Sequence, residues 1–325
     1  MNKRHFLHSL LGAAALYPLS PTYASEAWPT RPVRVVVPFP PGGGTDIVAR
    51  ALGQKLSDRL GQPVVIDNKP GASTIIGTDA AAKAAPDGYT LLLSGSTSYS
   101  VNPALRAKLP YDPVRDFTPL AIVARTPLVL VVAAGAPWQT VDQLAAAAKA
   151  QPKGIRYATF GAGSGPHLAG ELFALAAGVK LQDVPYRGSA QSTLAVIGGE
   201  IEMGIDTVAA VAPHIRAGRL RALGIVGATR SSLLPQVKTL AEQKLPDATF
   251  DAWYGFAAPA RTPAPIIERL GRDLAATMAD PALQAQLKTQ GMEPAFVGAA
   301  AFRVQMEGEI ARYLALAHRA GIAPE

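Results

Sequence analysis

Apolar runs of strand length alternate with longer patterns of helical period from residue 31 onward. Residues 31–37 are typical of a buried strand. The next segment has apolar residues at i, i+4 steps, which are Val48, Leu52, Leu56 and Leu60. This spacing predicts a helix with an apolar face, for which Thr45 is a suitable N-cap and Gly61 a suitable end.

The same alternation continues through residue 93. Strands are predicted over 63–68 and 89–93, with a helix over 74–85 between them. The connections are short and contain turn residues. This β-α-β-α-β order predicts a parallel sheet with helices on both of its faces.

A Pro-rich, less periodic stretch over 102–127 separates this unit from a second one of the same kind. The second unit has strands over 155–160, 181–186, 201–206 and 220–227, and helices over 166–178, 191–199 and 207–218. The terminal part adds one strand and further helices. We find no repeat of fixed period and no long flexible linker. The pattern therefore predicts two α/β lobes joined by crossing strands.

The first residues have the pattern of a secretory signal peptide. Lys3 and Arg4 precede an apolar run over 6–19, and small residues at 22–24 suit a cleavage site near Ala24. A membrane anchor is disfavoured because this run is short and contains Pro18. We expect export to the periplasm, by the Sec or the Tat route, and removal of residues 1–24.

Composition narrows the possible functions. The 325 residues are 49% hydrophobic and include no Cys, which excludes disulfides, thiol nucleophiles and thiolate metal sites. Cleavage would lower the formal charge of +7 by two, to +5. The basic residues are scattered, so nucleic acid is not expected as a partner. No later apolar stretch reaches membrane-spanning length, and the mature protein should be soluble.

The loops after the predicted strands are rich in Gly, Ser and Thr and poor in charge. Ligands of open parallel sheets bind at these carboxyl ends, where helix N-termini offer unpaired N–H groups to anions. The loop with Gly42 to Gly44 lacks the Lys of a Walker A loop and the third Gly of a Rossmann pattern. A tight turn alone would not require three consecutive Gly, so we interpret this loop as a ligand loop.

Signals for an enzyme are few. Ser164 lacks the first Gly of a G-x-S-x-G elbow, and the His residues lack metal-ligand spacing. Asp206 has two compatible interpretations, as the N-cap of the following helix or as a carboxylate that binds an ammonium, a hydroxyl or a protonated acid. Arg187 is interpreted as a solvated loop cation. A hydrolase or transferase that uses Ser164, His167 and Asp206 is the alternative function.

The combination of segments resembles the Bug family, the periplasmic solute-binding proteins of tripartite tricarboxylate transporters. The resemblance is carried by "WPTRPVRVVVPFPPGGGTDIVAR", "VVIDNKPGAST", "AAPDGYTLLL", "NPAL", "LPYDPVRDFTPL", "VPYRGSAQS" and "FAAPARTPAPI". It implies a two-lobed type II periplasmic-binding (Venus-flytrap) fold, each lobe a mostly parallel sheet flanked by helices. Lobe 1 would comprise residues 25–125 and 248–325, and lobe 2 residues 126–247.

The resemblance also implies a small carboxylate held between the lobes by backbone amides and hydroxyls. The family's ligands are di- and tricarboxylates, acidic amino acids and related organic acids. The hydroxyl-rich loop after residue 93 adds Ser96 and Thr97 to this set. The predicted ligand-binding residues are Phe39, Gly43, Gly44, Thr45, Asp46, Ser96, Thr97, Ser164, His167, Tyr186, Gly188 and Asp206.

The implied partners are integral-membrane permease subunits or a sensor kinase. We expect a monomer that is not an enzyme and needs no cofactor or metal. A regulatory ligand-binding domain of the LysR type shares this fold class, but an export signal and the lack of a helix-turn-helix before Trp28 disfavour it.

Overall fold

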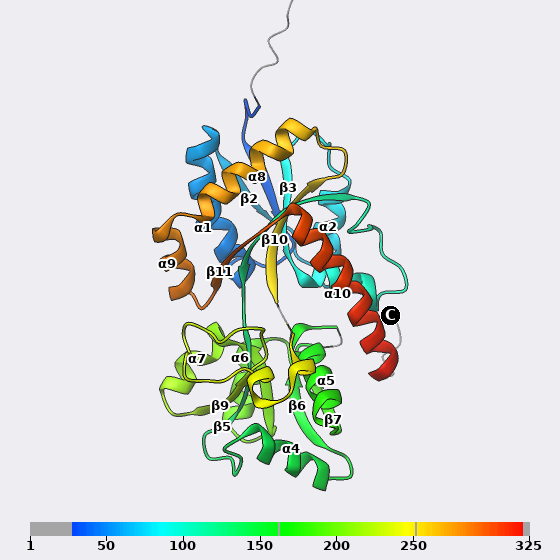
Figure 1. Ribbon diagram of the computed structural model, residues 1–325, viewed down its shortest axis with the longest axis vertical. Coiled ribbons are helices and arrows are strands. Elements are labelled where there is room, and N and C mark those ends of the chain that lie inside the picture. The colour runs from blue at the N-terminus through cyan, green and yellow to red at the C-terminus, as the bar shows by residue number, and fades with distance from the viewer. Residues whose placement is uncertain (1–27, 162, 251, 321–325) are drawn as a thin grey trace, which may run out of the picture.

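The computed structural model describes residues 28–161, 163–250 and 252–320, and they form two lobes that lie one above the other in Figure 1. The signal peptide predicted over residues 1–24 lies outside this part of the chain. None of the helices in the described residues is both long enough and apolar enough to cross a membrane.

Lobe 1 is built on a six-stranded sheet in the order β11-β4-β10-β3-β1-β2. Its strands are β1 (Val33–Val37), β2 (Val64–Asn68), β3 (Thr90–Gly95), β4 (Phe117–Arg125), β10 (Trp253–Pro259) and β11 (Glu293–Gly298). Its helices are α1 (Gly44–Leu60), α2 (Ile75–Ala82), the π-helix η1 (Thr97–Val101), α3 (Asn102–Leu105), α8 (Ala264–Met278), α9 (Pro281–Thr289) and α10 (Ala299–Ala320).

Lobe 2 is built on a five-stranded sheet in the order β7-β6-β8-β5-β9. Its strands are β5 (Leu128–Ala133), β6 (Ile155–Thr159), β7 (Leu181–Pro185), β8 (Met203–Thr207) and β9 (Leu220–Ile225). Its helices are α4 (Val141–Ala150), α5 (Gly165–Ala177), α6 (Ser189–Ile197) and α7 (Val208–Arg216), followed by the 3₁₀ turns η2 (Ala241–Gln243) and η3 (Pro246–Ala248).

The predicted two-lobed α/β architecture is confirmed, and both sheets are mixed where mostly parallel sheets were expected. In lobe 1, β1 pairs in parallel with β2 and β3, whereas β10 and β11 pair antiparallel with β4. In lobe 2, β6 pairs in parallel with β7 and β8, whereas β5 pairs antiparallel with β8 and β9. The chain leaves lobe 1 along β4 and returns along its neighbour β10, so these two strands run in opposite directions.

The apolar face predicted for the first helix lies in the core of lobe 1. Val48, Leu52 and Leu56 of α1 are at most 1% exposed and pack in one cluster with residues of β1 and β3. Burial of such side chains is worth about 1.5–3 kcal/mol each. The core therefore fixes α1 against the sheet, and with it the glycine loop at the start of the helix.

Two segments cross between the lobes, one between β4 and β5 and one before β10. They lie side by side, because the Thr126 N–H donates to the Ala252 carbonyl at 2.8 Å. The C-terminal half of α10 adds a further contact. Its residues Tyr313 and Leu316 belong to the same buried cluster as Phe173 of α5. The strands of the second sheet all lie between Leu128 and Ile225, within the range 126–247 expected for lobe 2. The exact lobe boundaries stay a proposal.

Candidate functional site

The carboxyl ends of the parallel strands lie beside the crossing segments. In lobe 1, Gly95 at the end of β3 pairs with Tyr254, near the start of β10. In lobe 2, Thr207 at the end of β8 pairs with Leu128, the first residue of β5. Because β1 and β2 run parallel to β3, and β6 and β7 to β8, the loops after all six strands lie at the edges between the lobes. This placement agrees with the ligand loops predicted at carboxyl ends.

The glycine loop leads into α1 without a side-chain cap. Gly43 is the N-cap of α1, and Thr45, which was predicted as the N-cap, lies in the first helical turn and is 3% exposed. The chain enters the helix earlier than predicted because Gly42 adopts a φ of 82°. A helix start without a side-chain cap leaves N–H groups available to an anion.

A tyrosine that sequence reasoning missed lies against this helix start. A Cβ at Gly44 would lie 2.5 Å from the Tyr254 hydroxyl oxygen, so a larger residue there would have to displace this side chain. Burial raises the pKa of Tyr254, and the nearby side chains of Thr45 and Thr126 oppose this rise. Tyr254 thus lies between the glycine loop and a crossing segment. Its strand was predicted only as an additional one, so no sequence signal placed it at the site.

Asp46 holds the glycine loop in shape. Its Oδ2 accepts from the Gly42 N–H at 2.9 Å and from Arg50 Nε at 2.9 Å, and its Oδ1 accepts from Asn68 Nδ2 at 3.0 Å. Burial alone would raise the pKa of Asp46, but these hydrogen bonds outweigh it and lower the pKa. The carboxylate therefore stays charged and serves the loop itself, while contact with a ligand stays a prediction.

Three other predicted residues lie in the lobe 1 loops. Phe39 packs with the lobe 1 core, and its carbonyl accepts from Asn68 Nδ2 at 3.1 Å. Ser96 is buried directly after β3, and Thr97, half-buried, begins η1. All three are therefore at the predicted edge of the sheet.

The loop after β2 has a conformation that its sequence does not reveal. Ala72, Ser73 and Thr74 have φ values of 46°, 50° and 78°, in the left-handed region that non-Gly residues rarely adopt. Asn102 Nδ2 donates to the Ser73 carbonyl at 2.8 Å, and Ser98 Oγ donates to Thr74 Oγ1 at 2.7 Å. A buried polar network thus holds this loop, and its residues were not among the predicted ones.

In lobe 2, Ser164 and His167 lie at the start of α5. Ser164 is the N-cap, and its Oγ accepts from the N–H groups of Phe160 at 3.3 Å and His167 at 3.4 Å. His167 is 7% exposed, and its Nδ1 accepts from the Gly163 N–H at 3.3 Å. Both side chains thus satisfy backbone donors of their own loop.

Asp206 is a buried carboxylate with neutral partners. It is 3% exposed; its Oδ2 accepts from Ser189 Oγ at 2.6 Å, and its Oδ1 from the Thr207 N–H at 2.7 Å. Burial raises the pKa of Asp206 from 3.8 to about 6, against the opposing effect of these hydrogen bonds. The N-cap interpretation of Asp206 is wrong, because Thr207 caps α7. Ser189, which was not predicted, connects this carboxylate to the start of α6.

The remaining predicted residues of lobe 2 lie in the loop after β7. Tyr186 is half-buried against the lobe 2 core, and Gly188 is the N-cap of α6. The Arg187 side chain is exposed, in line with its interpretation as a solvated cation.

The three residues of the alternative hydrolase do not form a catalytic relay. Ser164 Oγ and His167 Nδ1 accept from backbone N–H groups, and the partners of the Asp206 carboxylate are Ser189 and Thr207. A relay requires hydrogen bonds from nucleophile to base and from base to carboxylate. Within the described residues, no group of three or more His, Asp or Glu side chains is placed to hold a metal ion.

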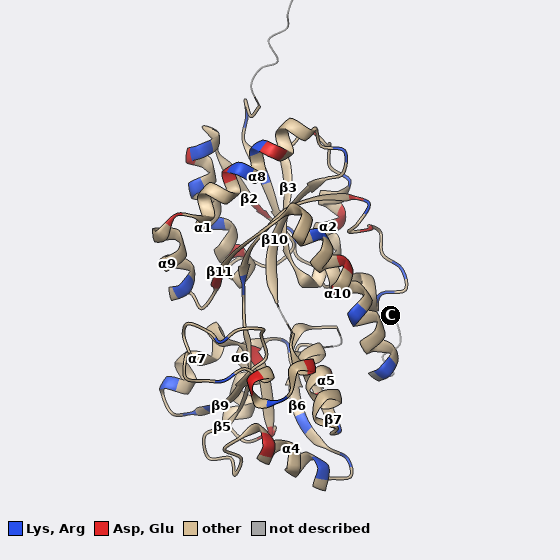
Figure 2. Cartoon of the chain, viewed as in Figure 1, with Lys and Arg blue, Asp and Glu red and all other residues tan. Residues whose placement is uncertain are grey.

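Charged residues are distributed over both lobes. Figure 2 shows Lys and Arg interspersed with Asp and Glu on the helices and loops of each lobe. The predicted ligand loops contribute hydroxyls and backbone amides. Asp46 is already paired to Arg50, and no cation in the described part of the chain pairs with Asp206.

The chain is similar to one protein family over most of its length. Residues 48–321 match the family described as "Tripartite tricarboxylate transporter family receptor". Protein BugT of Bordetella pertussis is 38% identical over 299 residues, which cover 92% of each chain. A UPF0065 protein encoded in the tcbD-tcbE intergenic region of Pseudomonas sp. (strain P51) is 40% identical, over 88% of this chain and 86% of that protein.

Two solved structures with ligands are similar in fold and in sequence. Rpa4515 of R. palustris with adipate is 36% identical, with a TM-score of 0.81, and the match covers 92% of this chain and 100% of that chain. MatC (Rpa3494) from Rhodopseudomonas palustris with bound malate is 29% identical, with a TM-score of 0.75, and the match covers 89% of this chain and 99% of that chain.

Proposed function

Because the chain belongs to the family of tripartite tricarboxylate transporter receptors, we propose that it is a periplasmic solute-binding protein that captures a small carboxylate between its two lobes. The bound acid would then be presented to a membrane permease or a sensor. The observation that carries this proposal is the position of both sets of ligand loops at the edges between the lobes.

The chemistry of these loops suits an anion. Helices α1, α5 and α6 each begin at such a loop, and their N-terminal N–H groups and dipoles favour negative charge. Two similar proteins were solved with adipate and with malate, which are dicarboxylates. The proposed ligand-binding residues are those predicted from the sequence, joined by Tyr254 and Ser189. We propose no catalytic role, since Ser164 and His167 accept from backbone N–H groups of their own loop and Asp206 accepts from Ser189 and Thr207.

A thermal-shift screen tests this function. A ligand that binds only the folded protein should stabilise it by about 2.7 kcal/mol at a 100-fold excess over Kd. We expect an increase in Tm with at least one acid of a mono-, di- and tricarboxylate panel that includes adipate and malate. No shift with any of them would contradict the proposal. Native mass spectrometry of protein purified from the periplasm would then identify a retained solute.

Thr45→Ala is expected to weaken ligand binding and to leave the fold intact. The substitution removes a buried hydroxyl from the first turn of α1, at the proposed ligand loop. A hydrogen bond from this hydroxyl to the ligand would be worth about 1 kcal/mol, which is roughly fivefold in Kd. Isothermal titration with the acid found in the screen measures the change. Thr45→Ser keeps the hydroxyl and is the control; equal affinity of all three proteins would limit Thr45 to packing.

A further inference from the structure

The turn at Gly291 and Met292, which leads into Glu293 as the first residue of β11, contacts elements of both lobes that begin at predicted ligand loops. On the lobe 1 side, Met292 is 2% exposed, and its Cε lies 3.3 Å from where a Cβ of Gly44 would be. On the lobe 2 side, a Cβ at Gly291 would lie 2.6 Å from Cβ of Ala209, the second residue of α7. The turn therefore packs between the start of α1 and the start of α7.

Glu293 joins this turn to lobe 2 by hydrogen bonds. Its Oε1 accepts from the Ser232 N–H at 2.6 Å and from Ser231 Oγ at 3.3 Å. Ser231 is 1% exposed and lies in the loop after β9. In the lobe 1 sheet, Glu293 pairs with Arg125, the last residue before a crossing segment. One carboxylate thus connects the lobes outside the crossing segments.

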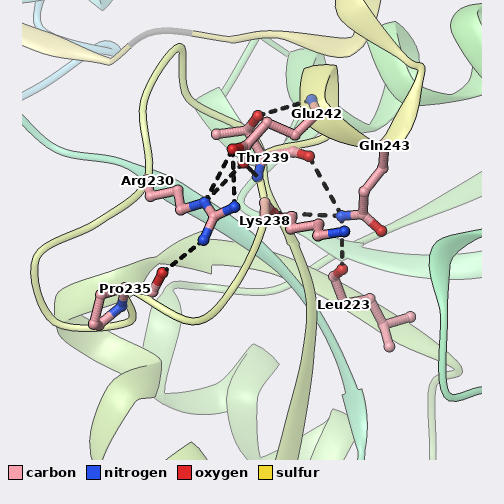
Figure 3. Close-up of polar contacts among 7 residues, drawn as sticks. All are labelled: Leu223, Arg230, Pro235, Lys238, Thr239, Glu242 and Gln243. Atoms are coloured by element: carbon pink, nitrogen blue, oxygen red, sulfur yellow. Dashed lines mark hydrogen bonds and ion pairs between the residues drawn. The ribbon is translucent and has the colours of Figure 1, made fainter.

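The lobe 2 loop that receives Glu293 is held in place by its own contacts, which Figure 3 shows. Arg230, next to Ser231, donates to both carboxylate oxygens of Glu242 and to the Pro235 carbonyl. Glu242 also accepts from the Thr239 N–H at 2.7 Å, and the hydrogen bond from Arg230 is the main reason that its pKa falls to about 2. These contacts tie the loop with Ser231 and Ser232 to the lobe 2 segment that contains Thr239 and Glu242.

We propose that Glu293 is a positioning residue for ligand binding, which sets the separation between the glycine loop of lobe 1 and the Asp206 loop of lobe 2. A ligand that contacts both lobes gains both sets of contacts only at a suitable separation. The crossing segments and the C-terminal half of α10 join the lobes elsewhere, and the Glu293 contact adds a restraint on the side of β11 and α7. The consequence for affinity rests on the proposed function, but the effect on lobe separation does not.

The separation can be measured without any ligand. The chain has no Cys, so a pair introduced at exposed Glu268 of α8 and Lys149 of α4 accepts spin labels at these two positions only. These helices lie toward opposite ends of the molecule in Figure 1. In the labelled protein, Glu293→Ala should shift the distance distribution to larger values and broaden it. Glu293→Gln keeps an acceptor oxygen and should restore a distribution close to that of the unsubstituted protein.

Glu307→Ala is the matched control, because Glu307 pairs within α10 with Arg303 at 3.8 Å and should leave the separation unchanged. Thermal unfolding of each variant shows whether it is folded. Equal distributions for Glu293→Ala and the unsubstituted protein would overturn the inference. With adipate and malate as probes, Glu293→Ala should weaken every acid that binds by a similar factor. If no acid of the panel binds, the proposed function is in question, while the distances still decide the role of Glu293.

Discussion

The Asp206→Asn variant is expected to be more stable than the unsubstituted protein at pH 7, by up to about 3 kcal/mol. Burial raises the pKa of Asp206 to about 6 in the folded state, from 3.8, so the charged form opposes folding. Asn removes that charge and keeps the geometry. Its oxygen can accept from the Thr207 N–H, and the Ser189 hydroxyl can accept from its amide.

The pH dependence has a definite sign. A carboxyl group whose pKa is raised on folding contributes stability below the unfolded pKa of 3.8 and loses it as pH rises through about 6. Urea unfolding at pH 4 and pH 7 should show this loss in the unsubstituted protein and a smaller one in Asp206→Asn. Asp58→Asn is the control, because it changes an exposed carboxylate on α1. It should lose as much stability between pH 4 and pH 7 as the unsubstituted protein. If Asp206→Asn lost as much stability between pH 4 and pH 7 as the unsubstituted protein, the raised pKa of Asp206 would be contradicted.

Asp206→Asn should also change ligand selectivity. Malate carries a hydroxyl group that can donate to a carboxylate, whereas adipate does not. If Asp206 accepts from such a group, Asp206→Asn weakens the binding of malate more than that of adipate. An equal effect on both acids would restrict Asp206 to positioning Ser189 and Thr207.

Trp253→Ala is expected to lower the free energy of unfolding by about 3–5 kcal/mol. Trp253 is fully buried at the start of β10, stacks on Tyr99 at 5.6 Å between ring centroids, and contacts Phe302 edge-on at 5.0 Å. Its Nε1 donates to Glu309 of α10, at 2.9 and 3.0 Å to the two oxygens. Alanine would leave a cavity and remove a donor from a largely buried carboxylate. Since domains are stable by about 5–15 kcal/mol, this loss is large.

Two other variants separate the packing effect from a general tryptophan effect. Trp253→Phe keeps much of the ring contact and should lose clearly less stability. Trp138→Ala removes a half-buried indole from lobe 2 and should also cost less. Chemical denaturation measures all three. If Trp253→Ala lowers the free energy of unfolding no more than Trp138→Ala does, the aromatic cluster around Trp253 is not a main source of stability.

The parallel units of the fold were predictable because periodicity and turn residues coincide there. The strands that were not predicted are β4, β5 and β11, and all three pair antiparallel with their neighbours. β4 lies within a Pro-rich stretch and β11 begins with Glu-Pro, so neither has a regular apolar pattern. β5 is a continuous apolar run, which by itself does not distinguish a strand from a buried helix.

For the site, sequence patterns predicted loops better than individual contacts. The glycine loop and the loops with Ser164 and Asp206 lie at the expected edges, because strand order alone puts them there. Tyr254 and Ser189 were not among the predicted ligand-binding residues, since each contacts the site through a residue distant in sequence, Gly44 and Asp206 respectively. The contact of Asp46 with Asn68 could not be predicted either, because it depends on the approach of β2 to the glycine loop.

Lobe 2 leaves and rejoins the rest of the chain at adjacent points, where the Thr126 N–H meets the Ala252 carbonyl at 2.8 Å. Because its two ends are neighbours, recombination could exchange lobe 2 as one module. Such an exchange would replace the proposed ligand contacts of lobe 2 in a single event and leave those of lobe 1 untouched. The incoming module would also have to accommodate Tyr313, Leu316 and Ala317 of α10, which complete the lobe 2 core from outside it.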